Sequence, residues 1–522
     1  MDYWAKPALD RHQALLFYPT LDESVSDNHP VRSLDEILRA LDWSAWEQEY
    51  NGRVGQPPIP PWVVAGVVLY GVMRRIRSSR HLEYACRNYV DFIWLAEGRT
   101  IDHDTICKFR TKFKEPLKEL FKQINHIAME MGLIQLLEVA FDGTRIKADA
   151  SRLHTWTAEK VQEVLQELGT QIEKMLSEAE AADATPCGES GARELPPELA
   201  DAKQRQEKLR DVLAKLLEAD AARKKEGVKT PAQLPKADTD SRVMPNKEGG
   251  YAPNYTPVAA TDGSRNFIVD CDVIGGPNEQ NELLSSVDRI EDNLGQKPAS
   301  VAADKAFGTG PNLEGMEQRQ VAFYTPVDSP VPEAGNPARR EDPRQPVPEA
   351  DWSKLPRNDK KKLAKCCFVY DETTDTYFCP LGKTMPYRET KKYDSSQGQK
   401  VSRIYGCKEC QGCPLAVECL DPKAKRGRTV TRDGHEPARE RMHAKMQTEE
   451  GRQTYNRRMH IGETPFAVIK GILDVRRFLL RGLEKVRTEW RWVCTACNLK
   501  KLIAALGALR AEGREMRVIA KG

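Results

Sequence analysis

Residues 133–150 read LIQLLEVAFDGTRIKADA, and this stretch decides the fold class. An apolar run ends at Asp142 and Gly143, which favour a turn, and a second short apolar run follows. The pattern predicts a strand, a turn and a strand. Helical spacing of apolar residues precedes this stretch, so we expect a β-sheet that follows an all-helical block.

Strand signals resume about a hundred residues later, in NYTPVAATDG (254–263) and NFIVDCDVIGG (266–276). A helix is predicted over 281–295, and further strands are predicted over 298–308 and 320–327. The order is that of an RNase H-like α/β core. We therefore expect a mixed sheet flanked by helices.

Two amphipathic segments, 160–181 and 203–225, interrupt the strands and are rich in Ala, Glu, Lys and Leu. Their spacing predicts two long helices, and the Pro- and Gly-containing break at 185–198 predicts an antiparallel hairpin inserted into the core. The expected organisation has five parts: an N-terminal helical DNA-binding domain (1–132), the first part of the core (133–154 and 236–330), the inserted hairpin (155–235), a linker and Cys-rich insertion (331–430), and a C-terminal helical part of the core (431–522).

Net charge is only +3 over 522 residues, but its distribution is uneven. Residues 421–522 hold 24 Lys and Arg against 12 Asp and Glu. Such a basic region fits a polyanionic partner, although a solvated basic surface gives the same count.

The N-terminal region after residue 57 predicts four or five helices up to about 132. Within it, TIDHDTICKFRTKF (100–113) predicts a capped helix that carries Lys108, Arg110 and Lys112. These residues are candidates for DNA contacts in a helix-turn-helix. An ordinary helical bundle with basic outer faces is the alternative.

Three acidic residues lie where a metal site for phosphodiester chemistry needs them. Asp142 ends the strand run EVAFDGT, Asp304 ends SVAADKAF, and Glu463 opens the helical run GETPFAVIK. Each alone has an ordinary explanation as a turn residue, a cap or a first-turn acid. Asp262, in AATDG, is a weaker candidate that a hairpin turn explains.

The motifs FDGT (141–144), ADKAF (303–307) and GETPFAVIK (462–470) resemble the three catalytic motifs of bacterial insertion-sequence transposases of the DDE class. The layout from about 29 to 506 resembles the subgroup named after insertion sequence eleven-eighty-two. A Tyr, Arg, Glu and Lys signature in that family matches Tyr455, Arg458, Glu463 and Lys470. The Arg458 to Glu463 spacing is one residue longer than in the signature, and Arg457 competes for that place.

The resemblance implies that Asp142, Asp304 and Glu463 bind two Mg²⁺ or Mn²⁺ ions. One ion would activate water or a DNA 3′-hydroxyl, and the other would stabilise the leaving oxygen. Lys470 and Arg458, with Tyr455 beside them, would contact phosphates near the reacting strand.

Five of the thirteen cysteines fall between 379 and 419. Cys407, Cys410, Cys413 and Cys419 follow one another at short spacing, and Cys379 precedes them in a Cys-Pro-x-Gly turn. Such thiolates can hold a structural Zn²⁺. The resemblance favours Cys379, Cys410, Cys413 and Cys419 as ligands, with Cys407 spare. Reduced thiols without a metal are the alternative, and Cys494 and Cys497 are expected to pack in a core.

These features predict a transposase that binds terminal inverted repeats and target DNA and that cleaves and transfers strands, as a homodimer on DNA. A nuclease without strand transfer and an inactive DNA-binding derivative are the alternatives. No run of residues approaches the roughly 18 apolar residues of a membrane helix, and the N-terminus lacks a signal-peptide pattern. We expect no membrane partner and a cytoplasmic, nucleoid-associated location.

Overall fold

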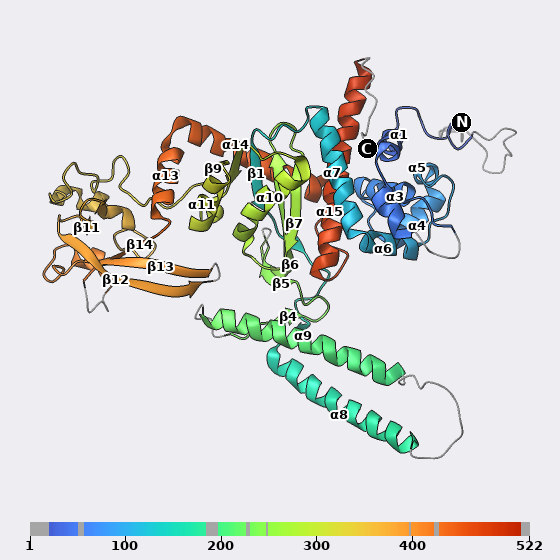
Figure 1. Ribbon diagram of the computed structural model, residues 1–522, viewed down its shortest axis with the longest axis horizontal. Helices are drawn as coiled ribbons and strands as arrows, with labels where there is room; N and C mark the ends of the chain where they lie inside the picture. The colour runs from blue at the N-terminus through green and yellow to red at the C-terminus, as the bar shows by residue number, and fades with distance from the viewer. Residues whose placement is uncertain are drawn as a thin grey trace, which may run out of the picture.

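A computed structural model describes residues 20–50, 57–183, 197–225, 230–246, 249–395, 398–421 and 427–512. The start of the expected domain 1–132 and the end of the expected domain 431–522 therefore lie outside the described residues. Most of the break expected at 185–198 lies outside them too. The described chain is a mixed α/β protein, and Figure 1 shows it as an elongated molecule with the sheet near its middle.

The central sheet is mixed. β1 (Val139–Gly143) lies between β6 (Tyr251–Asp262), with which it pairs antiparallel, and β8 (Ser300–Ala303), with which it pairs parallel. β8 also pairs parallel with β9 (Ala322–Tyr324), and β7 (Ile268–Ile274) pairs antiparallel with β6. The spatial order is thus β7-β6-β1-β8-β9. The first half of β6 also pairs with two short strands, β2 (Ile146–Lys147) and β5 (Arg242–Pro245).

Successive side chains of these strands point to opposite faces of the sheet, and both faces are buried. Ala259 and Cys271 belong to a hydrophobic cluster that includes α15 (Leu483–Ala511). Their neighbours Val258 and Ala260 belong to a second cluster. The helices of that second cluster include α10 (Leu283–Leu294), α11 (Gly310–Gln318) and α13 (Glu436–Gln447). Helices therefore cover the sheet on both sides.

The N-terminal helices share the α15 core rather than forming a separate one. They are α1 (Pro30–Ala40), α2 (Ser44–Glu47), α3 (Pro61–Met73), α4 (Ser79–Asn88), α5 (Val90–Leu95), α6 (His103–Lys112) and α7 (Lys114–Glu130). Trp46 on α2 stacks on Phe109 of α6 and also approaches Trp492 of α15. This aromatic group joins the two ends of the chain.

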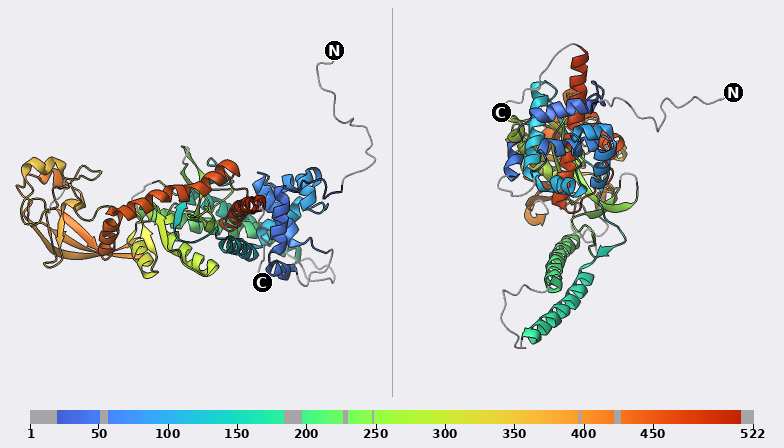
Figure 2. Two further views of the ribbon diagram at one scale, coloured as in Figure 1. Left: turned by 90° about the horizontal axis from the view of Figure 1, so that it is seen from above. Right: turned by 90° about the vertical axis from the view of Figure 1, so that its right-hand side faces the viewer.

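The inserted segment is a pair of long helices, α8 (Ala158–Asp183) and α9 (Pro197–Lys225), as the amphipathic spacing predicts. They bury their apolar residues against each other, among them Leu168 and Leu216. At their base β3 (Thr155–Trp156) pairs antiparallel with β4 (Leu234–Pro235). The pair projects away from the rest of the molecule in two perpendicular views (Figures 1 and 2).

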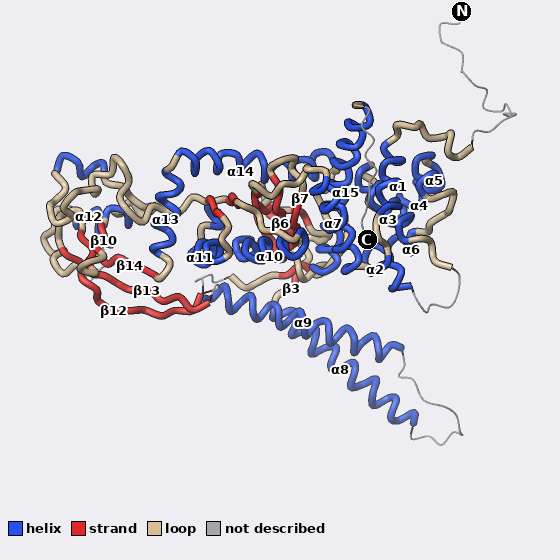
Figure 3. The backbone as a smooth tube through the Cα atoms, turned by 45° about the horizontal axis from the view of Figure 1, so that its top comes forward, coloured by secondary structure: helices blue, strands red, loops and turns tan. Residues whose placement is uncertain are grey.

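The Cys-rich region is a five-stranded antiparallel sheet, which the sequence analysis did not predict. Its long strands β12 (Thr384–Ser395) and β13 (Gly398–Gly406) form the ribbon seen in Figure 3. The expected linker before it contributes Ala338, Val347 and Leu355 to the core of this module, so it is irregular yet packed. The other elements of the module are β10 (Val369–Asp371), β11 (Thr376–Phe378), α12 (Ala416–Cys419) and β14 (Thr429–Asp433).

The C-terminal helical part expected over 431–522 is interrupted between Leu473 and Gly482. α14 (Glu449–Ala467) passes into one π-helical segment, Val468–Ile472, and α15 begins only at Leu483. Between them the chain runs beside β2, where Phe478 donates a hydrogen bond to the carbonyl of Lys147 at 2.9 Å. Pairing with the sheet outweighs helix propensity here.

Within the described residues, only α15 is long and apolar enough to cross a membrane by length and composition. The protein buries 56% of its most apolar window. A core helix passes the same test, so this is weak evidence for a membrane span.

Candidate active site

Asp142 and Asp304 end two neighbouring parallel strands. The last pair between β1 and β8 is Phe141 with Ala303, so each aspartate is the next residue along its chain segment. Asp142 is 8% exposed, and its Oδ1 accepts a hydrogen bond from the amide of Gly143. Asp304 caps the short 3-10 helix Lys305–Phe307 by accepting from the amide of Ala306 at 2.8 Å. Parallel pairing thus brings together two acids that are distant in the sequence.

Helix α14 packs against the end of β1 through Gly462. A Cβ at position 462 would lie 3.4 Å from the Cβ of Asp142 and 3.5 Å from that of Ala140. Glu463, the next residue, is exposed on the same turn of the helix. A small residue at position 462 lets the helix lie against Asp142, because a Cβ there would already be in van der Waals contact with β1.

The side chains are not gathered around a common point. Across the part of the chain that the structure describes, no group of three or more His, Cys, Asp or Glu side chains is arranged to hold a metal ion. Neither the three candidate acids nor the described cysteines form such a group.

A fourth carboxylate, which the sequence analysis missed, lies beside the strand end. Glu279 opens the 3-10 helix Glu279–Glu282, and its carboxylate packs over Gly143. It also lies 3.7 Å from a guanidinium nitrogen of Arg145, which donates a hydrogen bond to Thr256 at 2.7 Å. No spacing in the sequence links Glu279 to position 143, so only the fold could show this contact.

Lys470 holds the segment that follows Asp142. Its Nζ donates to Oγ1 of Thr144 at 2.6 Å and to the carbonyl oxygen of Arg145 at 2.9 Å. The π-helical segment places this lysine on the side of β1. Lys470, which was predicted to contact phosphate, therefore also stabilises the segment at the end of β1.

The two arginines that competed for one place in the signature have different surroundings. Arg457 donates through Nε to Glu138 at 2.9 Å. The guanidinium of Arg458 lies 5.3 Å from the ring centroid of Tyr455, and its buried Nε has no hydrogen-bond partner among the described residues. Arg457 is thus engaged in an ion pair, whereas Arg458 stacks on Tyr455.

Asp262 belongs to a turn at the opposite end of β1, where it pairs with Val139. It is fully buried, and its carboxylate accepts hydrogen bonds from three backbone amides: Gln135, Leu136 and Ser264. The hairpin-turn interpretation explains these contacts.

The three candidate DNA-binding residues of α6 differ in exposure. Lys108 is exposed, and Lys112 lies 3.6 Å from Glu49. Arg110 is buried and donates to the carbonyl of Arg77, which corrects the expectation that it contacts DNA. The face of α6 that carries Arg110 packs on α15, where Trp492 donates to the Arg110 carbonyl.

All five cysteines between 379 and 419 line one pocket of the Cys-rich module. Burial, the largest cause, raises the pKa of Cys407 and of Cys419 to about 12, and neighbouring thiols add to it. Burial likewise raises the pKa of Cys379. The amide of Arg428 donates to the sulfur of Cys410 at 3.3 Å. The fold thus places thiols from the β11–β12 turn and from the segment around α12 along one pocket, without grouping three of them as metal ligands.

Cys494 and Cys497 lie buried in α15, as expected for core packing. Within the described residues every cysteine is a free thiol.

Two known protein families match parts of this chain. Residues 378–503 match the family described as Transposase DDE domain, and residues 19–112 match the family described as Transposase domain (DUF772). The first match contains β12 to β14 of the Cys-rich sheet, α14 and most of α15, and therefore Glu463; the second contains α1 to α6. Asp142 and Asp304 lie outside both. No curated protein matches the chain.

The matches at the two ends of the chain agree with each other and with the resemblance drawn from the sequence. The class is that of transposases with a DDE domain, which are enzymes of DNA transposition. The chain is thus recognised as an insertion-sequence DDE transposase.

Proposed function

We propose that this chain binds the terminal inverted repeats of an insertion sequence and catalyses metal-dependent DNA cleavage and strand transfer through Asp142, Asp304 and Glu463. The single observation that carries this proposal is the meeting of two strand-end aspartates with the helix that bears Glu463. Further support for the subgroup named after insertion sequence eleven-eighty-two is the Cys-rich module before the glutamate.

The core is proposed to be RNase H-like. Three antiparallel strands followed by two parallel ones, with β1 in the middle of the order β7-β6-β1-β8-β9, support this assignment. The proposed domains keep the expected boundaries, although the N-terminal helices and α15 share one hydrophobic cluster.

The chemistry of the donor set fits divalent cations. Carboxylate oxygens are the ligands that Mg²⁺ and Mn²⁺ take, and Asp142, Asp304 and Glu463 come from two adjacent strand ends and one facing helix. Three carboxylates repel one another without a cation, so their side chains have reason to spread. When bound, two such ions supply the charge that an in-line displacement at phosphorus needs.

The neighbouring side chains would orient the DNA. Arg458 would contact a phosphate through its guanidinium, which lies over the ring of Tyr455. Lys470 would keep the Thr144–Arg145 segment in place, and with it the direction in which Asp142 points. Lys108 on α6 and the exposed Lys112 would add backbone contacts in the N-terminal domain.

We also propose a structural Zn²⁺ on Cys379, Cys410, Cys413 and Cys419, with Cys407 spare. Support comes from the shared pocket, since thiols that are far apart in sequence line one small space. A zinc ion would remove the protons of these thiols and would hold the turn and α12 together.

DNA is the partner that a transposase implies. Two element ends must be handled together, so we propose a homodimer on DNA, acting at the nucleoid in the cytoplasm.

The test is joining of an oligonucleotide that carries an element end to a target plasmid, with Mg²⁺ or Mn²⁺. The end sequence comes from the inverted repeats that flank the gene. We expect Asp304→Asn to reduce joining more than about 100-fold, because loss of even an outer partner of a metal ligand costs 10–100-fold. Binding of the end, measured by gel retardation, should stay close to that of the unmodified protein.

Asp328→Asn is the matched control, because Asp328 is 90% exposed and pairs with Lys305, beside Asp304. It should join strands normally. Normal joining by Asp304→Asn would overturn the carboxylate assignment. Nicking without joining by the unmodified protein would favour a nuclease, and binding without cleavage would favour an inactive derivative.

A further inference from the structure

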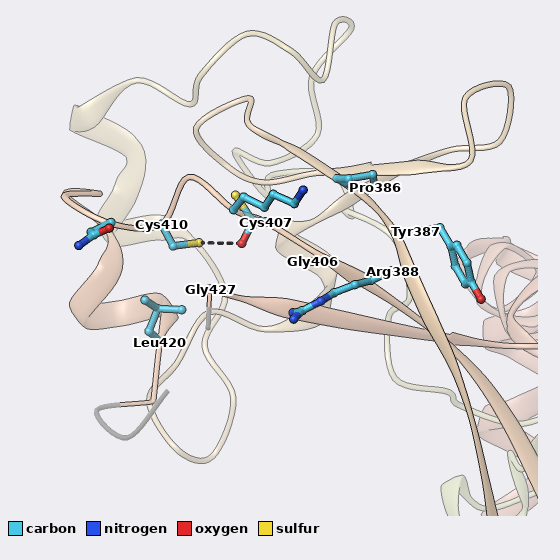
Figure 4. A pocket seen from close by; sticks show the side chains of 10 residues that line it. Pro386, Tyr387, Arg388, Gly406, Cys407, Cys410, Leu420 and Gly427 are labelled. Carbon is cyan, nitrogen blue, oxygen red and sulfur yellow. Dashed lines mark hydrogen bonds between the residues drawn. The ribbon is translucent and has the colours of Figure 1, made fainter. Parts of the chain in front are cut away.

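A wide hollow opens on the Cys-rich module beside the β12–β13 ribbon, away from the candidate active site (Figure 4). Its lining combines the ribbon with the cysteine-bearing turn. The residues that line it are Pro386, Tyr387, Arg388, Gly406, Cys407, Lys408, Cys410, Gln411, Leu420 and Gly427. No Asp or Glu belongs to this described lining, so the hollow carries two cations and no anion.

The ribbon presents Arg388 to this hollow through an irregularity in its pairing. The register of β12 against β13 shifts between Tyr387 and Glu389, which leaves Arg388 as the extra residue of a bulge. Its side chain crosses Gly406 on the neighbouring strand, since a Cβ there would lie 3.1 Å from Arg388 Cδ and 3.4 Å from a guanidinium nitrogen. A larger residue at 406 would displace this arginine.

Both cations are available to a ligand. Arg388 and Lys408 are exposed, and neither forms an ion pair or a side-chain hydrogen bond with any residue that the structure describes. Two other cations of the module are engaged: Arg403 pairs with Asp375, and Lys383 pairs with Glu409 at 2.8 Å. The hollow, by contrast, carries two positive charges that no described acid compensates.

We propose that this hollow binds the phosphate backbone of duplex DNA, with Arg388 and Lys408 as the phosphate-binding residues. A guanidinium and an ammonium that form no ion pair with a described residue fit successive phosphates, and a two-stranded ribbon can lie along a groove of the duplex. This inference rests on the proposed function, because it assigns to the Cys-rich module one part of the DNA that a transposase must hold.

The test measures the affinity of the full chain for a duplex that carries the element end, by fluorescence anisotropy at several salt concentrations. Each lost phosphate contact lowers the slope of log affinity against log salt by about 0.9. We expect Arg388→Ala/Lys408→Ala to reduce the slope by about 1.8 and the affinity roughly tenfold or more at physiological salt. Arg388→Lys should keep most of the slope, since the charge remains.

The matched control is Arg344→Ala/Lys360→Ala, which removes the same charge from two exposed residues of the module outside the hollow. Its slope should stay near that of the unmodified protein. Circular dichroism shows whether each variant is folded. Ethylation interference should reveal phosphates whose modification weakens the unmodified protein but not the hollow variant.

Two failures are distinguishable. If the unmodified chain binds the duplex and the hollow variant binds with the same slope as the control, this inference is overturned while the proposed function stands. If the unmodified chain does not bind duplex DNA, both are overturned.

Discussion

At the scale of single residues, Gly462 explains how the glutamate helix reaches the strand ends. The gap above Asp142 admits a Cβ, at 3.4 Å from the Asp142 Cβ, but leaves little room for anything longer. The identity of this residue therefore sets the distance between α14 and β1. Glu463 alone does not set that distance, because its side chain points to solvent.

We expect Gly462→Ala to be tolerated and Gly462→Leu to be damaging. Alanine stabilises a helix interior by up to about 1 kcal/mol relative to glycine, and its Cβ meets only ordinary contacts. Leucine would force its extra atoms into Asp142 and Ala140, which should lower the free energy of unfolding by about 1–3 kcal/mol and reduce strand joining. Urea unfolding and the plasmid-joining assay measure the two effects.

Gly507→Leu serves as the control, because Gly507 lies on α15 with open space around it. If Gly462→Leu were as stable and as active as this control, α14 would not pack against Asp142.

At the scale of elements, the Cys-rich sheet is a module with its own hydrophobic core. Its buried thiols have raised pKa values, about 12 for Cys407 and for Cys419, so they stay protonated at neutral pH without a metal. Zinc binds thiolates, and each proton must leave before the metal can bind. Zinc binding by the Cys-rich module should therefore depend on pH.

We expect about one equivalent of zinc in protein purified without chelators, and an affinity that rises with pH. Each thiol that loses a proton on binding should raise the zinc affinity about tenfold per pH unit below its pKa. Competition with a chromophoric chelator between pH 6.5 and 7.5 measures this dependence. Cys413→Ser should lose the metal, whereas Cys107→Ser, at an exposed thiol on α6, should keep it. Less than about half an equivalent, or an affinity that does not depend on pH, would contradict the zinc proposal.

At the scale of the whole molecule, a buried ion group ties the N-terminal helices to the last one. Glu489 on α15 is 6% exposed and lies 3.3 Å from a guanidinium nitrogen of Arg77. The same carboxylate accepts hydrogen bonds from the amides of Leu479 and Leu480. Arg110 lies beside this group, which is why it is unavailable to DNA.

Glu489→Ala should lower the free energy of unfolding by about 3–5 kcal/mol, because it leaves the buried Arg110 and the largely buried Arg77 without their counter-charge. Guanidinium-induced unfolding, followed by tryptophan fluorescence and by circular dichroism, measures the change. Glu484→Ala is the control on the same helix; Glu484 is 61% exposed, so its pairs should contribute less than about 1 kcal/mol. Equal effects of the two substitutions would show that the buried group does not join the two ends of the chain.

The sequence by itself determined the kinds of elements and the acids at their ends. Alternating and helical apolar spacing is a local property, so the strands around Asp142 and Asp304 and the helices of the inserted hairpin could be predicted from short windows. The five cysteines of the module were visible for the same reason. The motifs added the transposase class, which both family matches support.

Only the tertiary structure decided which surfaces those elements bury. Two contacts join segments more than a hundred residues apart: Glu279 packs on Gly143, and Lys470 binds Thr144. The burial of Arg110 depends on which face of its helix packs inward. A basic residue has the same letter whether its helix turns it toward solvent or toward a neighbouring helix. Packing of the apolar faces makes that choice, because burial of apolar area outweighs the preference of one charged side chain.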